Sequence, residues 1–119
     1  MPDLCHFEVP FEDYARAKKF YHDIFGWEIT DNSGEWGEYY GVKTSANENA
    51  VMGGMMKKQA PEHMLTVYFC VDSVDDTAAR IREYGGNVVM EKTEVKGVGY
   101  FAIVGDTEGN YFGIWESSK

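Results

Sequence analysis

Hydrophobic and polar residues follow the same order in the two halves of the chain. Each half opens with a short strand-like stretch, "HFEV" at residues 6–9 and "YFCV" at residues 68–71. Side chains that alternate in this way are typical of a β-strand with one buried face. An acidic pair comes next in each half, and then apolar residues recur three and four positions apart, which predicts a helix of about three turns. The chain therefore contains a weak internal repeat that begins with a strand and a helix.

One face of each predicted helix should be buried. The residues expected on these faces are Ala17, Phe20, Tyr21 and Ile24 in the first helix, and Ala78, Ile81 and contacts beside Tyr84 in the second. Gly26 and Gly85-Gly86 should end the two helices, because glycine adopts the left-handed conformation at a helix C-terminus at little cost.

Further strands are expected after each helix. One should follow the glycine directly, and the others should lie at residues 36–42 and 50–55 in the first half and at residues 99–104 and 110–116 in the second. Each half then has the order βαβββ, and the polar stretch "MKKQAPEHM" at residues 56–64 links them. We predict an α+β fold for a single domain of residues 1–119, with module 1 at about 4–56, a linker at about 57–64 and module 2 at about 65–116. Since one helix covers only one face of its sheet, the two modules should form a curved mixed sheet around a cleft that holds the functional site.

The composition restricts the partners and the compartment. With 119 residues, 44% of them hydrophobic, the chain is long enough for one domain with a core. The formal charge of −9 argues against nucleic acid and anionic membranes, which bind clustered Lys and Arg. The first residues predict no signal peptide, and the apolar run "LTVYFCV" at residues 65–71 is too short to cross a bilayer. We therefore expect a cytoplasmic protein in which Cys5 and Cys70 are reduced, buried thiols rather than a disulfide.

The two modules carry motifs of a known superfamily. With "HFEVP" and "AKKFYHDIFGWEI" in the first module, the chain resembles the vicinal oxygen chelate superfamily, which includes glyoxalase I, bleomycin-resistance proteins and extradiol dioxygenases. The segment "GVGYFAIVGDTEGNYFGIWE" resembles small bacterial proteins described as related to lactoylglutathione lyase. The similarity covers residues 4–116. It implies paired modules around a cleft and a homodimer, but the fold hosts isomerases, dioxygenases and pure binding proteins, so it does not fix the reaction.

The same resemblance implies where a metal site should lie. In the glyoxalase I pattern four strand positions hold a divalent ion, and in this sequence they fall on His6, on or next to Gly53, on Thr66 and on Gly113. His6 is the one position that matches, and a single imidazole does not hold such an ion firmly. We therefore expect no metal or other cofactor. The alternative is a divalent metal at a rebuilt site of His6, Glu8 and His63.

Strand parity adds further side chains to the expected cleft, because residues two apart share a face. The predicted ligand-binding residues are His6, Glu8, Thr66, Tyr68, Gly113 and Trp115. Glu8 is the candidate general base, and the alternative is an ion pair with a Lys or Arg. The glycines should leave room in the cleft, and Tyr111 and Trp115 beside Gly113 favour an organic ligand over an ion. The alternating residues that should pack under the helices are Phe7, Val9, Val67, Phe69, Phe112 and Ile114.

Three functions are compatible with these features. The first is a glyoxalase-related protein that binds a small organic molecule, or an enzyme of unassigned reaction, with the usual metal site largely lost. The second is a metal-dependent lyase or isomerase of the lactoylglutathione lyase type with an altered site. The third is a drug-sequestering protein of the bleomycin-resistance type, in which an acidic, aromatic cleft takes a large cationic ligand.

Overall fold

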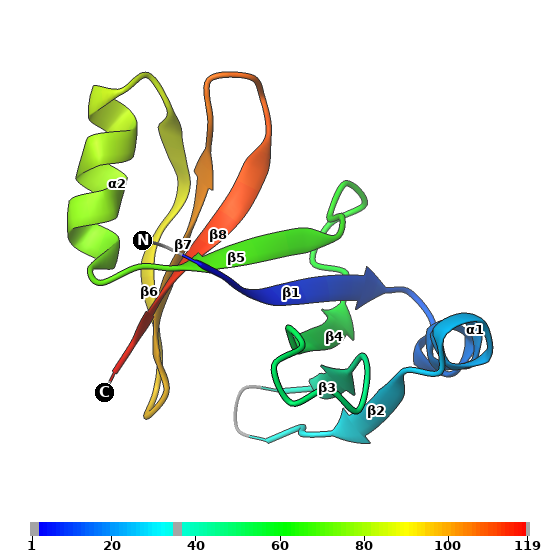
Figure 1. Cartoon of the computed structure of the whole chain (residues 1–119). Helices are drawn as coiled ribbons and strands as arrows, with labels where there is room; N and C mark the ends of the chain where they lie inside the picture. Colours follow the sequence, from blue (N-terminus) through cyan, green and yellow to red (C-terminus); the bar gives the residue numbers. More distant parts are fainter. Residues whose placement is uncertain (1–2, 35–36, 119) are drawn as a thin grey trace. The chain divides into compact units, whose positions relative to one another are not determined.

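The computed structural model describes residues 3–34 and 37–118 (Figure 1). The chain folds into two compact units, which are considered separately below. Unit 1 comprises Met1–Cys5 and Thr66–Lys119, and unit 2 comprises His6–Leu65. Each unit carries one of the predicted modules.

Unit 2 contains the first helix and a four-stranded sheet. Its elements are β1 (Asp3–Phe11), α1 (Tyr14–Phe25), β2 (Glu28–Asp31), β3 (Tyr40–Lys43) and β4 (Gly53–Lys57). The strand order is β2-β3-β4-β1, with β1 and β4 parallel and the other neighbours antiparallel. Strand β3 begins four residues later than predicted and β4 three residues later, and Trp36, which the first predicted strand included, lies outside the described residues.

Helix α1 begins and ends as its sequence predicts, and Ala17 and Tyr21 face the core as expected, but the rest of the predicted face does not. The Asp13 carboxylate accepts a hydrogen bond from the Arg16 backbone N–H at 3.0 Å, and Gly26 ends the helix in the left-handed conformation. Tyr14, Ala17 and Tyr21 pack on the core residues Val9, Phe11, Tyr40, Val42 and Met55.

The prediction that Phe20 and Ile24 are buried is wrong. Their side chains are 57% and 59% exposed. The helix is instead oriented by two stacked aromatic pairs, because Tyr14 lies on Tyr40 with centroids 3.7 Å apart and Tyr21 lies on Trp27 at 4.6 Å. The partners Tyr40 and Trp27 lie outside the helix, so its own periodicity could not reveal this orientation.

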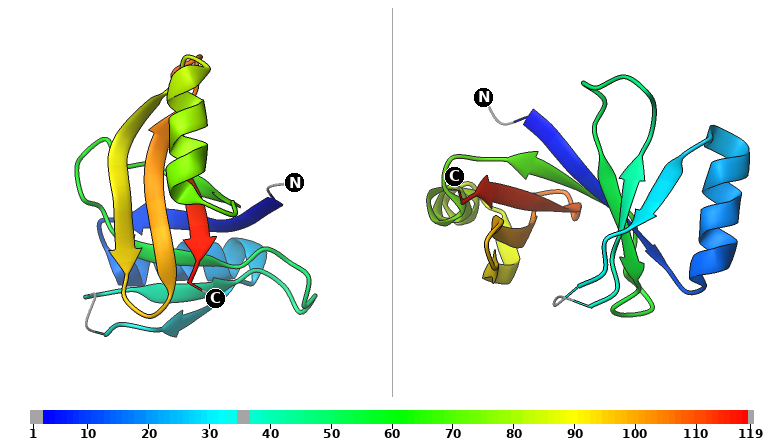
Figure 2. Two further views of the ribbon diagram at one scale, coloured as in Figure 1. Left: turned by 90° about the vertical axis from the view of Figure 1, so that its left-hand side faces the viewer. Right: turned by 90° about the horizontal axis from the view of Figure 1, so that it is seen from below.

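Unit 1 repeats the same order. Its elements are β5 (Thr66–Cys70), α2 (Val74–Glu83), β6 (Asn87–Val95), β7 (Gly99–Gly105) and β8 (Tyr111–Ser117). The first residues of β1, up to Cys5, also belong to this unit. The sheet order is β5-β8-β7-β6, with β5 and β8 parallel and the other neighbours antiparallel. Figure 2 shows α2 lying along strands β6 to β8.

The core of unit 1 lies under α2. Val74, Ala102, Val104 and Ile114 are buried there, and Ile81 packs against them. Ala78 is also buried, as predicted, whereas Tyr84 is exposed beside the Arg80 guanidinium. Both modules therefore have the order βαβββ, and the predicted α+β class with mixed sheets is confirmed. The cleft between the modules stays a prediction.

The prediction that the cysteines are reduced is wrong for this structure. Cys5 and Cys70 form a disulfide within unit 1, with Cα atoms 5.7 Å apart. Their half-buried strand positions suit a thiol equally well, so burial could not distinguish the two forms. No helix in residues 3–34 and 37–118 is both long and apolar enough to cross a membrane.

Candidate functional site

Strand β1 places two polar side chains on the face of unit 2 that is turned away from α1. Val9 is buried in the core under the helix, so His6 and Glu8, which alternate with it and Phe7, project to the opposite side. Their side chains are 31% and 19% exposed, respectively. His6 Nε2 lies 3.5 Å from Glu8 Oε2. The predicted pairing of these two residues on one face is therefore present in the structure.

Tyr39 joins the two side chains. Its hydroxyl oxygen lies 3.0 Å from His6 Nε2 and donates a hydrogen bond to Glu8 Oε2 at 3.3 Å. Because that proton points to Glu8, the phenol oxygen can accept a hydrogen bond from an Nε2–H of His6. The three side chains form a connected polar group, to which we refer as the His6–Tyr39–Glu8 group.

The position of Tyr39 depends on a glycine in the neighbouring strand. Glu8 pairs with Gly54 in β4, so both face the same side of the sheet. A Cβ atom on Gly54 would lie 1.8 Å from the Tyr39 hydroxyl oxygen, which is far inside van der Waals contact. The absence of a side chain at residue 54 therefore lets the tyrosine reach His6 and Glu8.

This register selects between the residues predicted for the second metal position. That position was assigned to Gly53 or a neighbour, but Gly53 pairs with Phe7, and its Cβ would lie 2.5 Å from the Phe7 ring on the side facing α1. Gly54 is the residue that faces His6, and Tyr39 supplies the polar group there. Tyr39 was not among the predicted site residues. Alternation places residues 39 and 41 on one face of their strand, but it does not show that Gly54 of β4 lies beside them.

Tyr39 is held in its protonated form. Burial of the phenol, followed by the negative charge of Glu8 and the hydrogen bond to it, raises the pKa of Tyr39 well above its usual range. The hydroxyl is therefore a hydrogen-bond donor at every physiological pH. A protonated donor next to a carboxylate and an imidazole can bind an oxygen atom of a ligand and can assist a proton transfer.

The other predicted ligand residues lie in unit 1. Tyr68 pairs with Gly113 across the parallel strands β5 and β8, and Trp115 pairs with Cys70. Thr66 begins β5 on the same face as Tyr68. Unit 1 therefore brings Thr66, Tyr68, Gly113 and Trp115 onto one face.

Gly113 does not leave open space, contrary to the prediction. A Cβ atom at residue 113 would lie 2.2 Å from the Tyr68 ring, and Tyr68 is only 7% exposed. The Phe101 ring meets Tyr68 edge-on, with centroids 6.4 Å apart. The glycine between Tyr111 and Trp115 thus accommodates an aromatic side chain of its own sheet.

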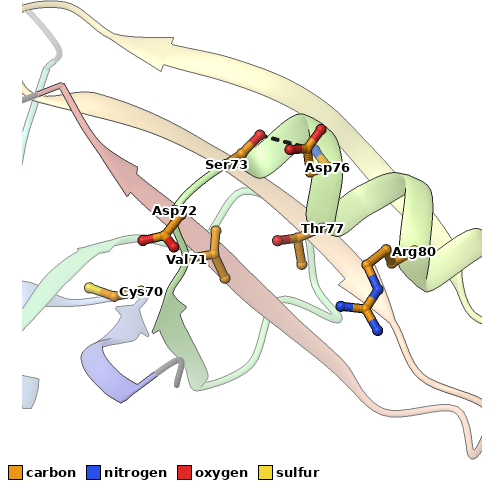
Figure 3. A pocket seen from close by; sticks show the side chains of 7 residues that line it. All are labelled: Cys70, Val71, Asp72, Ser73, Asp76, Thr77 and Arg80. Atoms are coloured by element: carbon orange, nitrogen blue, oxygen red, sulfur yellow. Dashed lines mark hydrogen bonds between the residues drawn. The ribbon is translucent and has the colours of Figure 1, made fainter.

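A pocket was not anticipated at the start of α2 (Figure 3). Its lining residues are Cys70, Val71, Asp72, Ser73, Asp76, Thr77 and Arg80. Two of the N–H groups at this helix N-terminus already have partners, since the Ser73 hydroxyl accepts from the Asp76 N–H and Glu116 accepts from the Val74 N–H at 2.8 Å. Of the side chains predicted to bind a ligand, none lines this pocket, so the His6–Tyr39–Glu8 group remains the candidate site.

The residues present do not fit the four-ligand metal site that the resemblance implied. Gly54 and Gly113 have no side chain that could bind a metal, and the Tyr39 and Tyr68 side chains occupy the space beside them. Across residues 3–34 and 37–118, no three His, Cys, Asp or Glu side chains are grouped closely enough to hold a metal ion. His63, the third residue of the alternative site, accepts a hydrogen bond from the Gln59 N–H through Nδ1.

Paired βαβββ modules, with polar groups on strand faces, define the class of protein. The chain belongs to the Glyoxalase/Bleomycin resistance protein/Dioxygenase superfamily, whose sequence profile matches residues 4–114. The resemblance inferred from the sequence motifs is thus confirmed.

Two curated relatives show the extent of the sequence similarity. CFP32 of Mycobacterium tuberculosis, which is named a glyoxylase, is 31% identical over 111 residues, covering 90% of this chain and 42% of the relative. The anthracycline biosynthesis protein DnrV of Streptomyces peucetius is 27% identical over 125 residues, covering 92% of this chain and 45% of the relative. The chain therefore spans less than half the length of these curated relatives.

Solved structures share the fold at low sequence identity. Methylmalonyl-CoA epimerase from Mycobacterium tuberculosis has a TM-score of 0.71 at 15% identity, covering 98% of this chain and 88% of the epimerase. The hypothetical protein BH1468 from Bacillus halodurans has a TM-score of 0.74 at 10% identity, covering 99% and 96% of the two chains. At such identities the likeness shows the fold alone.

Proposed function

We propose that this chain is a small-molecule-binding protein of its superfamily, and that the His6–Tyr39–Glu8 group contacts an oxygen atom of an organic ligand without a metal. One observation carries the proposal. The Tyr39 hydroxyl lies over Gly54, within hydrogen-bonding distance of both His6 and Glu8. A donor that stays protonated therefore lies where the superfamily pattern would place a metal ligand.

The group also has the components of a proton transfer beside a carbonyl. Glu8 would take a proton from the carbon next to a ligand carbonyl, and the electron pair of that C–H bond would form a C=C bond while the carbonyl oxygen becomes an enolate oxygen. As Glu8 becomes protonated, the Tyr39 hydroxyl would turn from Glu8 and donate its hydrogen bond to that oxygen, while the Nε2–H of His6 continues to donate to the phenol oxygen. Return of the proton from Glu8 to carbon restores the carbonyl and the carboxylate. The net reaction is an isomerisation or epimerisation that consumes no other reactant.

The relatives support a carbonyl ligand. CFP32 is named a glyoxylase, and a solved methylmalonyl-CoA epimerase of the same fold is in complex with methylmalonyl-CoA. The charge of −9 favours a neutral or cationic ligand over a multiply anionic thioester. A homodimer and a cytoplasmic location, expected from the sequence, remain part of this proposal.

Two observations favour other functions. His6 Nε2 and Glu8 Oε2 are 3.5 Å apart and both atoms are metal donors, which favours a lyase or isomerase with an altered metal site. The acidic composition favours sequestration of a large cationic drug. The three functions differ in the ligand that they require and in their need for metal.

A titration with three probes distinguishes them. Wild-type protein in EDTA would be titrated with hydroxyacetone, S-lactoylglutathione and metal-free bleomycin while the NMR signals of His6 and Tyr39 are followed. We expect hydroxyacetone to shift these signals, and Tyr39→Phe to weaken its binding roughly tenfold through loss of a donor.

The same probe tests the catalytic role of Glu8. In deuterated water, exchange of the hydroxyacetone methylene protons should be about 100-fold slower or more with Glu8→Gln, while binding persists. Binding only after a divalent metal replaces EDTA would favour the lyase, and binding of bleomycin alone would favour sequestration. Either result contradicts the proposed function.

A further inference from the structure

Beside Tyr39, a second polar side chain lies over the sheet of unit 2. Gly54 pairs with Gly41 in β3, and Gly41 pairs with Thr30 in β2, so these three residues share the face of Glu8. Tyr39 covers Gly54. Asn32 covers Gly41, because a Cβ atom at residue 41 would lie 2.6 Å from Asn32 Nδ2.

The backbone fixes Asn32 next to Tyr39. The Asn32 N–H donates to the Tyr39 carbonyl oxygen at 2.9 Å, immediately beyond the last paired residues of β2 and β3. The two side chains thus start from neighbouring positions and lie over neighbouring glycines. Gly41 and Gly54 pair directly in antiparallel strands, and residues paired in this way have Cβ positions about 5 Å apart. The Asn32 amide and the Tyr39 hydroxyl, which lie over these two glycines, are therefore separated by a similar distance.

The Asn32 amide is available to a ligand. Asn32 is exposed, and its side chain makes no hydrogen bond to any residue in the described ranges 3–34 and 37–118. An amide can both donate and accept, so it can bind a hydroxyl, a carbonyl or a carboxylate. The Tyr39 hydroxyl, in contrast, is held between His6 and Glu8.

We infer that Asn32 is a specificity-determining residue, which binds a second oxygen group of the ligand whose first oxygen contacts Tyr39. The ligand is then an elongated carbonyl compound that carries a hydroxyl or carboxylate oxygen about 5 Å from its carbonyl oxygen. This inference rests on the proposed function, because it concerns the same site.

A matched pair of probes isolates the second oxygen. The compounds 4-hydroxy-2-butanone and 2-butanone have the same carbon chain and differ by one hydroxyl group. Wild-type protein should bind the hydroxyketone roughly fivefold to tenfold more tightly, as one neutral hydrogen bond allows. Asn32→Ala should remove this preference and leave the affinity for 2-butanone unchanged.

Two further variants separate binding from folding. Gly41→Ala should also remove the preference, because the added methyl group would displace the end of the flexible Asn32 side chain while Asn32 itself is kept. Asn49→Ala, at another exposed asparagine of unit 2, should retain the preference. All three variants should keep the wild-type thermal midpoint.

The outcomes separate the two proposals. Equal binding of both ketones by the wild type, or an equal loss for both ketones in Asn32→Ala, would overturn the role of Asn32 and leave the proposed function standing. If neither ketone shifts the His6 and Tyr39 signals of the wild type, both proposals are overturned.

Discussion

Reduction of the Cys5–Cys70 disulfide is expected to lower the free energy of unfolding by about 4 kcal/mol. The bond joins residues 65 positions apart, so it closes a long loop and restricts the unfolded chain strongly. That loop contains all of unit 2, since Cys5 immediately precedes His6 and Cys70 follows Leu65 by five residues. Urea denaturation with and without dithiothreitol measures the difference.

A double Cys5→Ser, Cys70→Ser variant is the control for this prediction. It should unfold like the reduced wild type and should not respond to dithiothreitol. Thiol titration of the wild type, unfolded without reductant, should find no reactive cysteine. Two reactive thiols and no effect of dithiothreitol would contradict the disulfide and restore the reduced form predicted from the sequence.

Gly54→Ala is expected to lower the affinity for hydroxyacetone at least about tenfold, because it displaces Tyr39 from the site. The added methyl carbon would lie 1.8 Å from the Tyr39 hydroxyl oxygen, so the phenol must move away from Glu8 and His6. The backbone at residue 54 lies outside the left-handed region, so alanine fits the main chain. NMR titration measures the affinity.

Gly53→Ala is the matched control, one residue away on the opposite face. Its methyl carbon would lie 2.5 Å from the Phe7 ring on the side facing α1, so overpacking should lower stability by about 1–3 kcal/mol. Affinity for hydroxyacetone should be retained. Loss of binding in Gly53→Ala together with normal binding in Gly54→Ala would contradict the register of β1 and β4.

The repeat was predictable because it depends on sequence patterns that are local in the chain. Alternating strands, acidic helix starts and glycine helix ends lie within a few residues of one another, and they gave the order βαβββ in both modules. The orientation of α1 was not predictable in the same way. It depends on Tyr14 and Tyr21 stacking on Tyr40 and Trp27, which are partners outside the helix.

The site was predictable only in part. His6 and Glu8 are two residues apart on one strand, so their shared face followed from the sequence. Tyr39 immediately precedes β3, and its side chain reaches His6 and Glu8 across Gly54 in β4. The contact of Tyr39 with these two residues depends on the register of β1, β4 and β3, which are far apart in the chain. For the same reason the Tyr68 ring over Gly113 could not be foreseen, and the glycine was interpreted as open space.

The central claim is that the His6–Tyr39–Glu8 group binds its ligand without a metal. Elemental analysis of protein purified without chelator, and again after incubation with Ni, Zn, Mn or Fe and desalting, tests this most directly. The account predicts metal far below one equivalent for the wild type and for His6→Ala alike. One equivalent of metal in the wild type that is lost in His6→Ala would contradict it and indicate a lyase or dioxygenase with a rebuilt metal site.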